Sequence, residues 1–387
     1  MLPPRAPKHL VFVITGLFTG GAEMMLYKLL SRLNRGKFRA SVISLTPGGS
    51  LRDQIQHLGI PVYCVGMKSQ QINLRAILAF IPLMRKLSPD LIQGWMTHGN
   101  LIAQISRYVL SSSVPILWSI RHSALKPSET KLTTRLIIGL LAHFSHLPEG
   151  IIYNSRSGAE DHHRIHYAPL KTVIISNGID TDLFHPSLTN RLKIRQELGL
   201  EDHTIIIGLI GRFHVMKGHE YFLQAAALLL PIFPETQFLL VGSEVTPKNP
   251  VLSNLVRSLG LESHVHLGGE RQDIPRLTAA LDIACSTSSF GEGFANVIGE
   301  AMACGVPCVV TNVGDAAWIV GETGFVIPPA DPVALCEAWK ALICMDRSAR
   351  QALGLQARQR VEAHFALDKI VRQYEAVYEE IFSKWKH

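Results

Sequence analysis

The sequence predicts an α/β protein of two domains, each built around a parallel β-sheet. The chain has 387 residues, which is too many for one ordinary hydrophobic core and suits two domains. Short runs rich in β-branched residues alternate with longer segments of helical periodicity, which is the pattern of repeated βα units. The turn-forming sequence Asn177-Gly178-Ile179-Asp180 interrupts this pattern, so we place the second domain after it.

Thirteen runs are expected to be strands, seven in the first domain and six in the second. The first series comprises residues 11–14, 40–45, 61–65, 90–94, 115–120, 150–154 and 172–176. The second series comprises residues 204–211, 237–242, 264–268, 283–286, 307–311 and 325–327. From Asp346 onwards we expect only helices, because apolar residues recur there at helical spacing. The predicted domains are therefore 1–179 and 180–365, followed by a C-terminal helix over 366–387.

The composition describes a globular protein, with 47% hydrophobic and 18% charged residues. Its longest apolar runs, such as 225–233, are far shorter than the ~20 residues that a membrane-spanning helix needs. Residues 8–14 resemble the basic and apolar parts of a signal peptide. They lead directly into a glycine-containing turn with the rhythm of a first parallel strand, so we interpret them as that strand.

The cysteines and the net charge bear on the compartment and the partner. None of the six cysteines forms a C-x2-C pair and most fall in apolar patterns, which indicates buried free thiols in a reducing, cytoplasmic compartment. The formal net charge of +7 predicts an anionic partner. The basic residues are scattered, and no recognition helix, zinc finger or aromatic RNA-binding platform is evident. An anionic membrane surface or a phosphorylated acceptor therefore fits better than nucleic acid.

The most informative segment runs from residue 290 to residue 300. Glu292 and Glu300 lie eight positions apart, so one carboxylate is expected at the mouth of a strand-to-helix loop and the other further along the helix. Gly291 and Gly293 have no side chain that would keep a ligand from the backbone. An anion is favoured at the N–H groups that open the helix, which belong to Phe294, Ala295 and Asn296. A nucleotide sugar has this layout, with hydroxyls at two places and negative charge between them.

An earlier loop supplies two cations. Arg212 and Lys217 lie five positions apart, between the strand expected at 204–211 and the next helix. A planar guanidinium and a lysine ammonium can together hold a diphosphate.

Loops of the first domain also follow predicted strands, at the edge where parallel sheets bind ligands. Gly20 and Gly21 follow the first strand, where a tight turn would explain them equally well. His98 and His122 follow the strands at 90–94 and 115–120, and each is either a sugar-orienting group or a hydrogen-bonded loop residue. Residues 161–166 contain histidines at a metal-chelating spacing. We interpret them as a solvated helix face, because no catalytic carboxylate accompanies them.

These segments resemble the retaining glycosyltransferases of the two-domain GT-B fold, specifically glycosyltransferase family 4. The resemblance rests on E-x7-E at 292–300, G-R-F-x3-K-G at 211–218 and the linker N-G-I-D-x3-F-x-P at 177–186. It implies two Rossmann-like domains that face each other across a cleft, with the last helix crossing back to the first domain. The nucleotide sugar would then bind the second domain and the acceptor the first.

The resemblance also implies roles for the donor residues. Glu300 would hold the ribose hydroxyls, and Glu292 would contact the transferred sugar. Arg212 and Lys217 would neutralise the pyrophosphate of the leaving group. The base would be read by the backbone near 269–271, which places Arg271 at the substrate.

In the first domain, the resemblance implies that the loop of Gly20 and Gly21 lets the acceptor or a phosphate approach backbone N–H groups. It favours His122 as the residue that orients the transferred sugar, and gives His98 a contact with the acceptor. The residue at 318 is usually Glu in the family, and Trp318 departs from that pattern.

The expected reaction transfers a glycosyl group from a nucleoside diphosphate sugar to a hydroxyl with retained configuration, without a metal ion or cofactor. Asp180-Thr181-Asp182 matches the D-x-D metal motif of the other large glycosyltransferase class, but it lies in the linker. Alternatives are a phosphorylase-like enzyme with a lysine-bound pyridoxal cofactor, a non-catalytic nucleotide-sugar-binding protein and a transferase with a soluble acceptor. The sequence does not decide which nucleotide base and which sugar the donor carries.

The expected acceptor is a lipid-linked saccharide of envelope polysaccharide or glycolipid synthesis, with the protein peripheral at the inner face of the membrane. The segment expected to rest on anionic headgroups combines Leu29, Leu30 and Leu33 with basic neighbours. Those neighbours are Lys28, Arg32, Arg35, Lys37 and Arg39.

Overall fold

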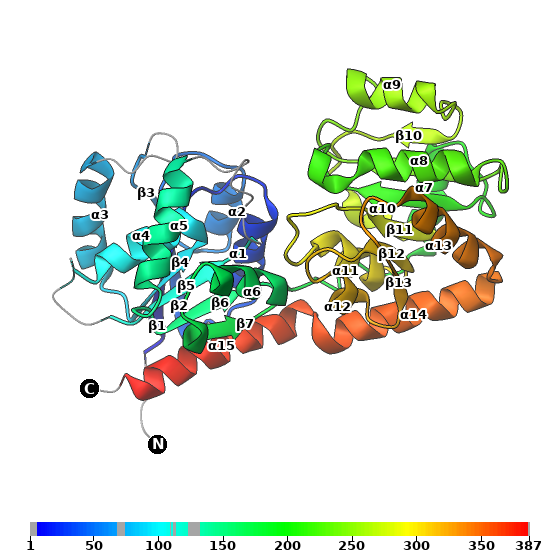
Figure 1. Ribbon diagram of the computed structural model, residues 1–387. Coiled ribbons are helices and arrows are strands. Elements are labelled where there is room, and N and C mark those ends of the chain that lie inside the picture. Colours follow the sequence, from blue (N-terminus) through cyan, green and yellow to red (C-terminus); the bar gives the residue numbers. More distant parts are fainter. Residues whose placement is uncertain (1–5, 68–73, 109, 111–113, 123–131, 386–387) are drawn as a thin grey trace. The chain divides into compact units, whose positions relative to one another are not determined.

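The computed structural model divides into two compact units, each with its own parallel sheet and covering helices (Figure 1). The structure describes residues 6–67, 74–108, 110, 114–122 and 132–385. The first unit contains Met1–Gly178 together with Leu367–His387, and the second contains Ile179–Ala366. Both units have the Rossmann-like layering predicted from the sequence.

The strands of the first unit are β1 (Lys8–Ile14), β2 (Phe38–Ser44), β3 (Val62–Cys64), β4 (Leu91–Trp95), β5 (Ile116–Ile120), β6 (Gly150–Tyr153) and β7 (Thr172–Ile174). They pair in parallel in the order β3-β2-β1-β4-β5-β6-β7. The chain builds outward from β1 to β3 and then returns beside β1 to begin the other half at β4. This reversal places the ends of β1 and β4 next to each other, which is where open α/β sheets bind ligands.

Helices cover both faces of this sheet. Because successive residues of a strand face opposite sides, Leu10 and Phe12 of β1 join one hydrophobic core and Val11 and Val13 join the other. The first core is closed by α1 (Gly21–Arg32), α2 (Leu51–His57) and α15 (Leu367–Lys384). The second core is closed by α3 (Leu74–Leu87), α4 (Met96–Ser106), α5 (Leu132–Phe144) and α6 (Arg156–Arg164).

The C-terminal helix α15 is anchored in the first unit by a buried arginine. Arg121, at the end of β5, donates from Nη1 to Asn177 Oδ1 at 2.9 Å and from Nη2 to the Tyr374 hydroxyl of α15. Its guanidinium lies 4.1 Å from the centre of the Trp95 ring. Burial lowers the pKa of Arg121. A neutral amide, a hydroxyl and an indole face thus hold this cation and join α15 to the sheet.

The strands of the second unit are β8 (Ile206–Ile210), β9 (Gln237–Val241), β10 (Val265–Leu267), β11 (Ile283–Ser286), β12 (Cys308–Thr311) and β13 (Gly324–Ile327). Their order is β10-β9-β8-β11-β12-β13, again all parallel, so the reversal of the chain lies between β8 and β11. The helices are α7 (Leu188–Glu197), α8 (His219–Leu229), α9 (Pro250–Ser258), α10 (Ile274–Ala279), α11 (Asn296–Ala303), α12 (Ala316–Val320), α13 (Pro332–Cys344) and α14 (Arg347–His364).

All thirteen predicted strands are present, and only their ends differ, by up to three residues. The largest difference is at β1, which begins at Lys8 instead of residue 11. Lys8 and His9 pair with Phe38 and Arg39 of β2, so the ladder extends beyond the apolar run that predicted the strand.

One expectation about exposure is wrong, and another is confirmed for most of its residues. Leu29, Leu30 and Leu33, expected on a membrane-facing surface, are 0%, 0% and 3% exposed because this face of α1 packs into the first core. Cys64 and Cys344 are exposed, whereas the other four cysteines are buried, and all six thiols are free. Within the described residues, no helix is both long enough and apolar enough to cross a membrane.

Candidate functional site

In the second unit, the candidate residues lie on loops that follow two neighbouring strands. β8 and β11 pair in parallel, so both strands end at the same edge of the sheet. The first loop passes through the short helix η3 (Val215–Lys217) to Gly218, and the second runs over 287–295 to the start of α11. These are the loops in which the sequence predicted the diphosphate and sugar contacts.

Lys217 and Glu292 are in direct contact. Lys217 Nζ and Glu292 Oε1 form an ion pair, and the two side chains are only 20% and 12% exposed. Ser288 Oγ donates a hydrogen bond to the same Oε1 at 2.8 Å. Two residues that were assigned separately to the diphosphate and to the sugar therefore form one charged pair, which is shielded from much of the solvent screening that weakens surface pairs.

Backbone contacts hold the two loops together. Thr287 Oγ1 donates to the carbonyl oxygen of Lys217 at 2.8 Å, and the Ser289 N–H donates to that of Met216 at 2.8 Å. Gly291 has a φ of +76°, and a Cβ atom there would lie 2.7 Å from Met216 Sδ. The left-handed φ favours glycine at 291, whereas the flexible Met216 side chain could move away from an added Cβ atom.

A third loop, after β12, supports the second one. Thr311, the last residue of β12, donates from Oγ1 to the carbonyl oxygen of Ser288 at 2.6 Å. The Asp315 N–H donates to the carbonyl oxygen of Gly293 at 3.0 Å. The loop that carries Glu292 is therefore fixed from the two neighbouring strands, β8 on one side and β12 on the other.

Gly314 brings this third loop against the backbone of Glu292. It has a φ of +61°, and a Cβ atom there would lie 2.4 Å from the carbonyl oxygen of Glu292. The sequence interpretation gave no role to Ser288, Thr311 or Gly314. The sequence did contain a signal for them. Ser288 follows β11, Thr311 ends the adjacent strand β12, and Gly314 comes shortly after it.

Helix α11 begins at Asn296 with Ala295 as its N-cap residue, and no side chain caps it. Phe294 directs its ring into the core, where the ring centre lies 5.4 Å from that of Phe365. Phe294 and Ala295 are each 5% exposed, so their side chains are turned away from solvent. The contact expected through their backbone N–H groups stays a prediction.

Glu300 lies on α11, just over one turn beyond the start of the helix, and is partly exposed. Burial, followed by the charge of Glu300, raises the pKa of the nearby Cys304 thiol to about 12. The two carboxylates of the E-x7-E segment thus belong to different elements, Glu292 to the loop and Glu300 to the helix.

The two remaining candidate cations of this unit differ in their surroundings. Arg212 is exposed on the loop after β8. Arg271 donates to both carboxylate oxygens of Asp273, at 2.7 and 2.8 Å, and lies 3.4 Å from Glu197. The hydrogen bonds to Asp273 raise the pKa of Arg271. Its guanidinium is thus already paired with carboxylates, and recognition of the base by the backbone near 269–271 stays a prediction.

In the first unit, the candidate residues gather at the ends of three adjacent strands, β1, β4 and β5. Gly20 is the N-cap of α1 and Gly21 its first residue, and no side chain caps the helix. A Cβ atom on Gly20 would lie 2.4 Å from a carboxylate oxygen of Glu23, a flexible side chain that could move aside. His98 and His122 follow the other two strands.

His122 is partly exposed and packs against a second histidine. Its Nε2 lies 3.1 Å from Thr97 Oγ1, and its ring centre lies 5.4 Å from that of His162. His162 is 2% exposed and donates from Nδ1 to the carbonyl oxygen of Gly158 at 2.7 Å. Burial, followed by the charge of His122, lowers the pKa of His162 to about 4. The solvated helix face expected over 161–166 is therefore wrong for His162, which α6 turns inward.

His98 is only 5% exposed on α4. Its neighbours lock the helix into the sheet. A Cβ atom on Gly99 would lie 2.2 Å from the carbonyl oxygen of Val13, and the Asn100 side chain bonds both the N–H and the carbonyl of Ser119, at 3.0 and 3.1 Å. The predicted contact between His98 and an acceptor would require the side chain to become more exposed.

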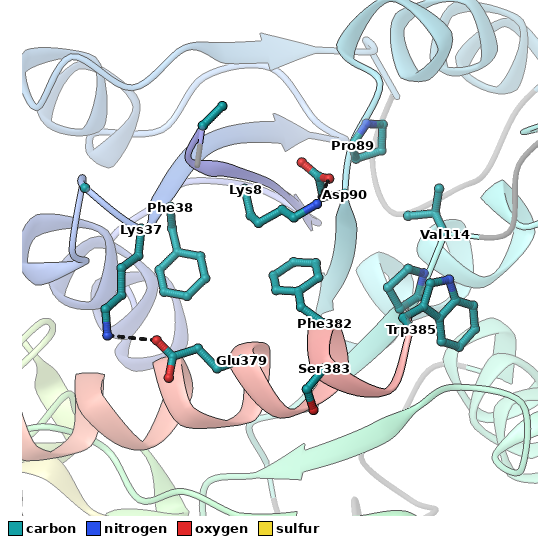
Figure 2. Close-up of a pocket in the computed structure, with 13 residues that line it drawn as sticks. Lys8, Lys37, Phe38, Pro89, Asp90, Val114, Glu379, Phe382, Ser383 and Trp385 are labelled. Carbon is teal, nitrogen blue, oxygen red and sulfur yellow. Dashed lines mark hydrogen bonds and ion pairs between the residues drawn. The ribbon is translucent and has the colours of Figure 1, made fainter. Parts of the chain in front are cut away.

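A cavity of about 860 Å³ lies elsewhere in the first unit (Figure 2). It is lined where β1, β2 and β4 begin, by Lys8, Phe38 and Asp90, and by Phe382 of α15. Lys8 forms an ion pair with Asp90 at 2.7 Å, and its Nζ lies 5.5 Å from the centre of the Phe382 ring. Parallel strands begin at the edge opposite to the one where they end, so this cavity is separate from the candidate residues.

The Asp180 carboxylate of the linker has a local structural role. Asp180 Oδ1 accepts hydrogen bonds from the N–H groups of Asp182 and Leu183, both at 3.1 Å, which caps a turn. No group of three or more His, Cys, Asp or Glu side chains in the described part of the chain is arranged to hold a metal ion.

Trp318 strengthens the packing below the site. Its ring centre lies 5.0 Å from that of Phe365, the residue that also packs against Phe294. Arg360 donates to the carbonyl oxygen of Trp318 at 2.6 Å. The departure from the usual Glu thus adds an aromatic contact beneath the loop that carries Glu292.

Two family models match this chain. The model described as Glycosyltransferase Family 4 matches residues 19–183, and the one described as Glycosyl transferases group 1 matches residues 204–344. Together they span most of both units.

The lipopolysaccharide core biosynthesis mannosyltransferase LpsB of Rhizobium meliloti is 31% identical over 56% of this chain and 62% of that protein. This match spans less than two thirds of the relative's length. The UDP-Gal:alpha-D-GlcNAc-diphosphoundecaprenol alpha-1,3-galactosyltransferase of Escherichia coli is 23% identical over 72% of each chain.

Among solved structures, Anabaena HepE in complex with UDP has a TM-score of 0.83 at 24% identity, covering 96% of this chain and 100% of that one. Likeness at this identity shows the fold alone. The motifs, the two parallel-sheet units and both family models agree, and the chain belongs to the group 1, family 4 glycosyltransferases of the GT-B fold.

Proposed function

We propose that this glycosyltransferase is a retaining enzyme that moves a sugar from a nucleoside diphosphate sugar to a hydroxyl group of a lipid-linked saccharide. The observation that carries the proposal is the meeting of Lys217, Glu292 and the uncapped start of α11 on interlocked loops at one sheet edge. A cation, a carboxylate and a helix N-terminus are what a diphosphate joined to a sugar requires.

In the proposed complex, the diphosphate lies at the start of α11, where the helix dipole favours negative charge. Lys217 and the exposed Arg212 supply the positive charge. The diphosphate then competes with Glu292 for the Lys217 ammonium, and this leaves the Glu292 carboxylate to accept a hydrogen bond from a sugar hydroxyl. Glu300, further along α11, holds the ribose hydroxyls.

In the proposed reaction, the bond between the anomeric carbon and the diphosphate oxygen breaks. A new bond forms from that carbon to the acceptor oxygen on the same face of the sugar, and the acceptor proton passes to an oxygen of the departing diphosphate. Lys217 and Arg212 stabilise the charge that grows on the leaving group, which accelerates the reaction because the interaction is strongest in the transition state. His122 orients the sugar, and neither a metal ion nor a cofactor takes part.

The nature of the acceptor is suggested by two relatives. One is named for the lipopolysaccharide core and the other for a diphosphoundecaprenol-linked sugar. We extend this chemistry to the present chain, which would then work as a peripheral protein at the inner face of the membrane. Because the structure of HepE was solved with UDP and with UDP-glucose, uridine is the first base to test.

A thermal-shift panel of UDP-, GDP- and ADP-sugars tests the donor, and transfer assays with the best donor test the acceptor. We expect one nucleotide class to raise the melting temperature and its sugar to reach a polyprenyl-diphosphate saccharide with retained configuration, read by proton NMR. Activity should persist in EDTA. Inverted product, or loss in EDTA that manganese restores, would overturn the mechanism. Transfer to soluble acceptors alone would replace the lipid-linked acceptor, and donor binding without any transfer would indicate a non-catalytic binding protein.

A further inference from the structure

Helix α5 of the first unit is apolar on both of its sides, and only one of them is covered. Ile137 and Leu141 pack into the core that α5 shares with α3 and α4. On the other side, Leu132, Leu136 and Leu140 are 68%, 66% and 45% exposed. These three leucines, the α5 stripe, are spaced by four residues and so form one continuous row along the helix. Isolated exposed leucines are ordinary, but a continuous apolar row marks an interaction surface.

The charge around the α5 stripe indicates what covers it. The first unit, which contains α5, has 24 Lys and Arg residues and 11 Asp and Glu residues. Its formal net charge is therefore +13. The helix itself contains no acidic residue, and Arg135 is exposed next to the stripe. On α3, Arg85 and Lys86 are also exposed.

We propose that the α5 stripe docks on a bilayer of anionic phospholipid, with its leucines among the headgroups and the surrounding cations against the phosphates. Thirteen residues give α5 a length of about 20 Å, too short to cross the ~30 Å hydrocarbon core, so the helix lies in the plane of the surface. A second copy of the chain fits this face less well, because it would place Arg135 and a unit of net charge +13 against their own counterparts.

This inference rests on the peripheral membrane association proposed above and names the face that makes it. It replaces the α1 face expected from the sequence, whose leucines are buried. The exposed stripe belongs to the unit assigned to the acceptor, so docking would bring that unit to the surface where a lipid-linked acceptor is found. The test below needs neither donor nor acceptor, so its result is independent of whether the protein transfers sugar.

The experiment is vesicle sedimentation of the whole protein. Vesicles of phosphatidylcholine alone are compared with an equal mixture of phosphatidylcholine and phosphatidylglycerol. The test variant combines Leu132→Gln, Leu136→Gln and Leu140→Gln. The matched control changes three exposed leucines of the second unit, which are 64%, 47% and 54% exposed, to glutamine: Leu188, Leu192 and Leu355.

The wild-type protein and the matched control should sediment with the anionic vesicles, and binding should weaken as salt rises. The α5 variant should bind at least ~10-fold more weakly, because three leucines no longer enter the apolar layer. An Arg135→Glu variant should weaken binding by a smaller factor and reduce its salt dependence. An unchanged melting temperature shows that the α5 variant is folded.

Three results would overturn the proposal: no binding of the wild-type protein to anionic vesicles, equal binding of the α5 variant, or equal binding to phosphatidylcholine alone. Analytical ultracentrifugation tests whether a second copy of the chain covers the α5 stripe instead of a membrane. A wild-type dimer that the α5 substitutions dissociate, without vesicle binding, would assign the stripe to self-association. Vesicle binding that persists in a protein without transferase activity would contradict the proposed function and leave this inference intact.

Discussion

The two units differ sharply in charge. The first unit contains 24 Lys and Arg residues against 11 Asp and Glu residues, whereas the second contains 14 against 20. Their formal net charges are therefore +13 and −6, which the overall value of +7 conceals. The unit assigned to the anionic donor is thus the negative one. A nucleotide sugar must be held there by local groups, while the positive field of the first unit acts over its whole surface.

The second unit is built for such local recognition. Lys217 and Glu292 are paired, the loop that carries Glu292 is bonded from both neighbouring strands, and the start of α11 is uncapped. In the first unit, one candidate histidine is buried and the other packs against His162. We therefore expect substitutions in the second unit to change donor binding and turnover at single residues, whereas the first unit attracts anionic partners through its overall charge.

Removing one donor-site cation should have the largest effect. Lys217→Ala should reduce kcat by roughly 100-fold, because a preorganised charge that stabilises the leaving diphosphate is lost. Lys248→Ala, at an exposed lysine of the same unit, is the control and should leave turnover unchanged. Steady-state kinetics measures both, and wild-type kcat in Lys217→Ala would remove this residue from the diphosphate site.

Acid should destabilise both units through histidines whose pKa is lowered by burial: His162 and His219, and also His9 and His266. Burial lowers the pKa of His162 and of His219 to about 4 from the usual 6.5. Between these values the unfolded chain binds a proton that the folded chain does not, so stability falls as the pH drops from about 6.5 towards 4, by up to ~3 kcal/mol per histidine. Neutral pH keeps this stability.

Urea unfolding at pH 7 and pH 5 measures the effect. His162→Phe should flatten the acid dependence of the first unit, and His219→Phe that of the second. His203→Gln, at an exposed histidine, should change neither. An acid dependence that survives both phenylalanine variants would show that other groups control it.

Donor affinity should depend on Glu300. Glu300→Gln should weaken binding of the nucleotide sugar at least ~10-fold, because charge-assisted hydrogen bonds to the ribose are lost. Glu322→Gln, exposed in the same unit, is the control. Calorimetry measures the affinities, and an unchanged value for Glu300→Gln would place the ribose elsewhere.

The smallest effect is expected from a matched pair of glycines. Gly314 and Gly260 have φ values of +61° and +68°, so alanine costs each about 1 kcal/mol of stability. A Cβ atom at Gly260 meets nothing within 4 Å, whereas one at Gly314 would lie 2.4 Å from the carbonyl oxygen of Glu292. Only Gly314→Ala should therefore also lower turnover, by a few-fold. Equal turnover in the two variants would show that the position of Glu292 does not depend on this contact.

The sequence predicted all thirteen strands, because each is a short apolar run between turn residues and needs no distant information. It also assigned Lys217 and Glu292 to one donor site, and the structure brings these two side chains into contact, while their role in binding a donor stays a prediction. Arg121, Thr311 and Gly314 were missed because their partners lie far away in the chain or on a strand whose neighbours the sequence does not reveal.

The surface of the first unit also depends on contacts between residues that are distant in the chain, which the sequence does not reveal. Both α1 and α5 combine leucines with basic residues, and the sequence interpretation chose α1 as the membrane face. In the folded unit, α1 packs Leu29 and Leu30 into the core, whereas α5 leaves Leu132 and Leu136 exposed. Which side of a helix is covered depends on the neighbours that tertiary packing brings to it.

In the proposed complex, the second unit holds the donor by local groups despite its negative charge. Hydrogen-exchange mass spectrometry of the whole protein tests it, with UDP-, GDP- or ADP-glucose added in turn. For the nucleotide that binds, slower exchange is predicted over 211–218 and 287–300 in the second unit, and Glu300→Gln should remove that protection. Protection confined to the first unit, whether at Gly20 and Gly21 or around the cavity lined by Lys8 and Phe382, would contradict the account.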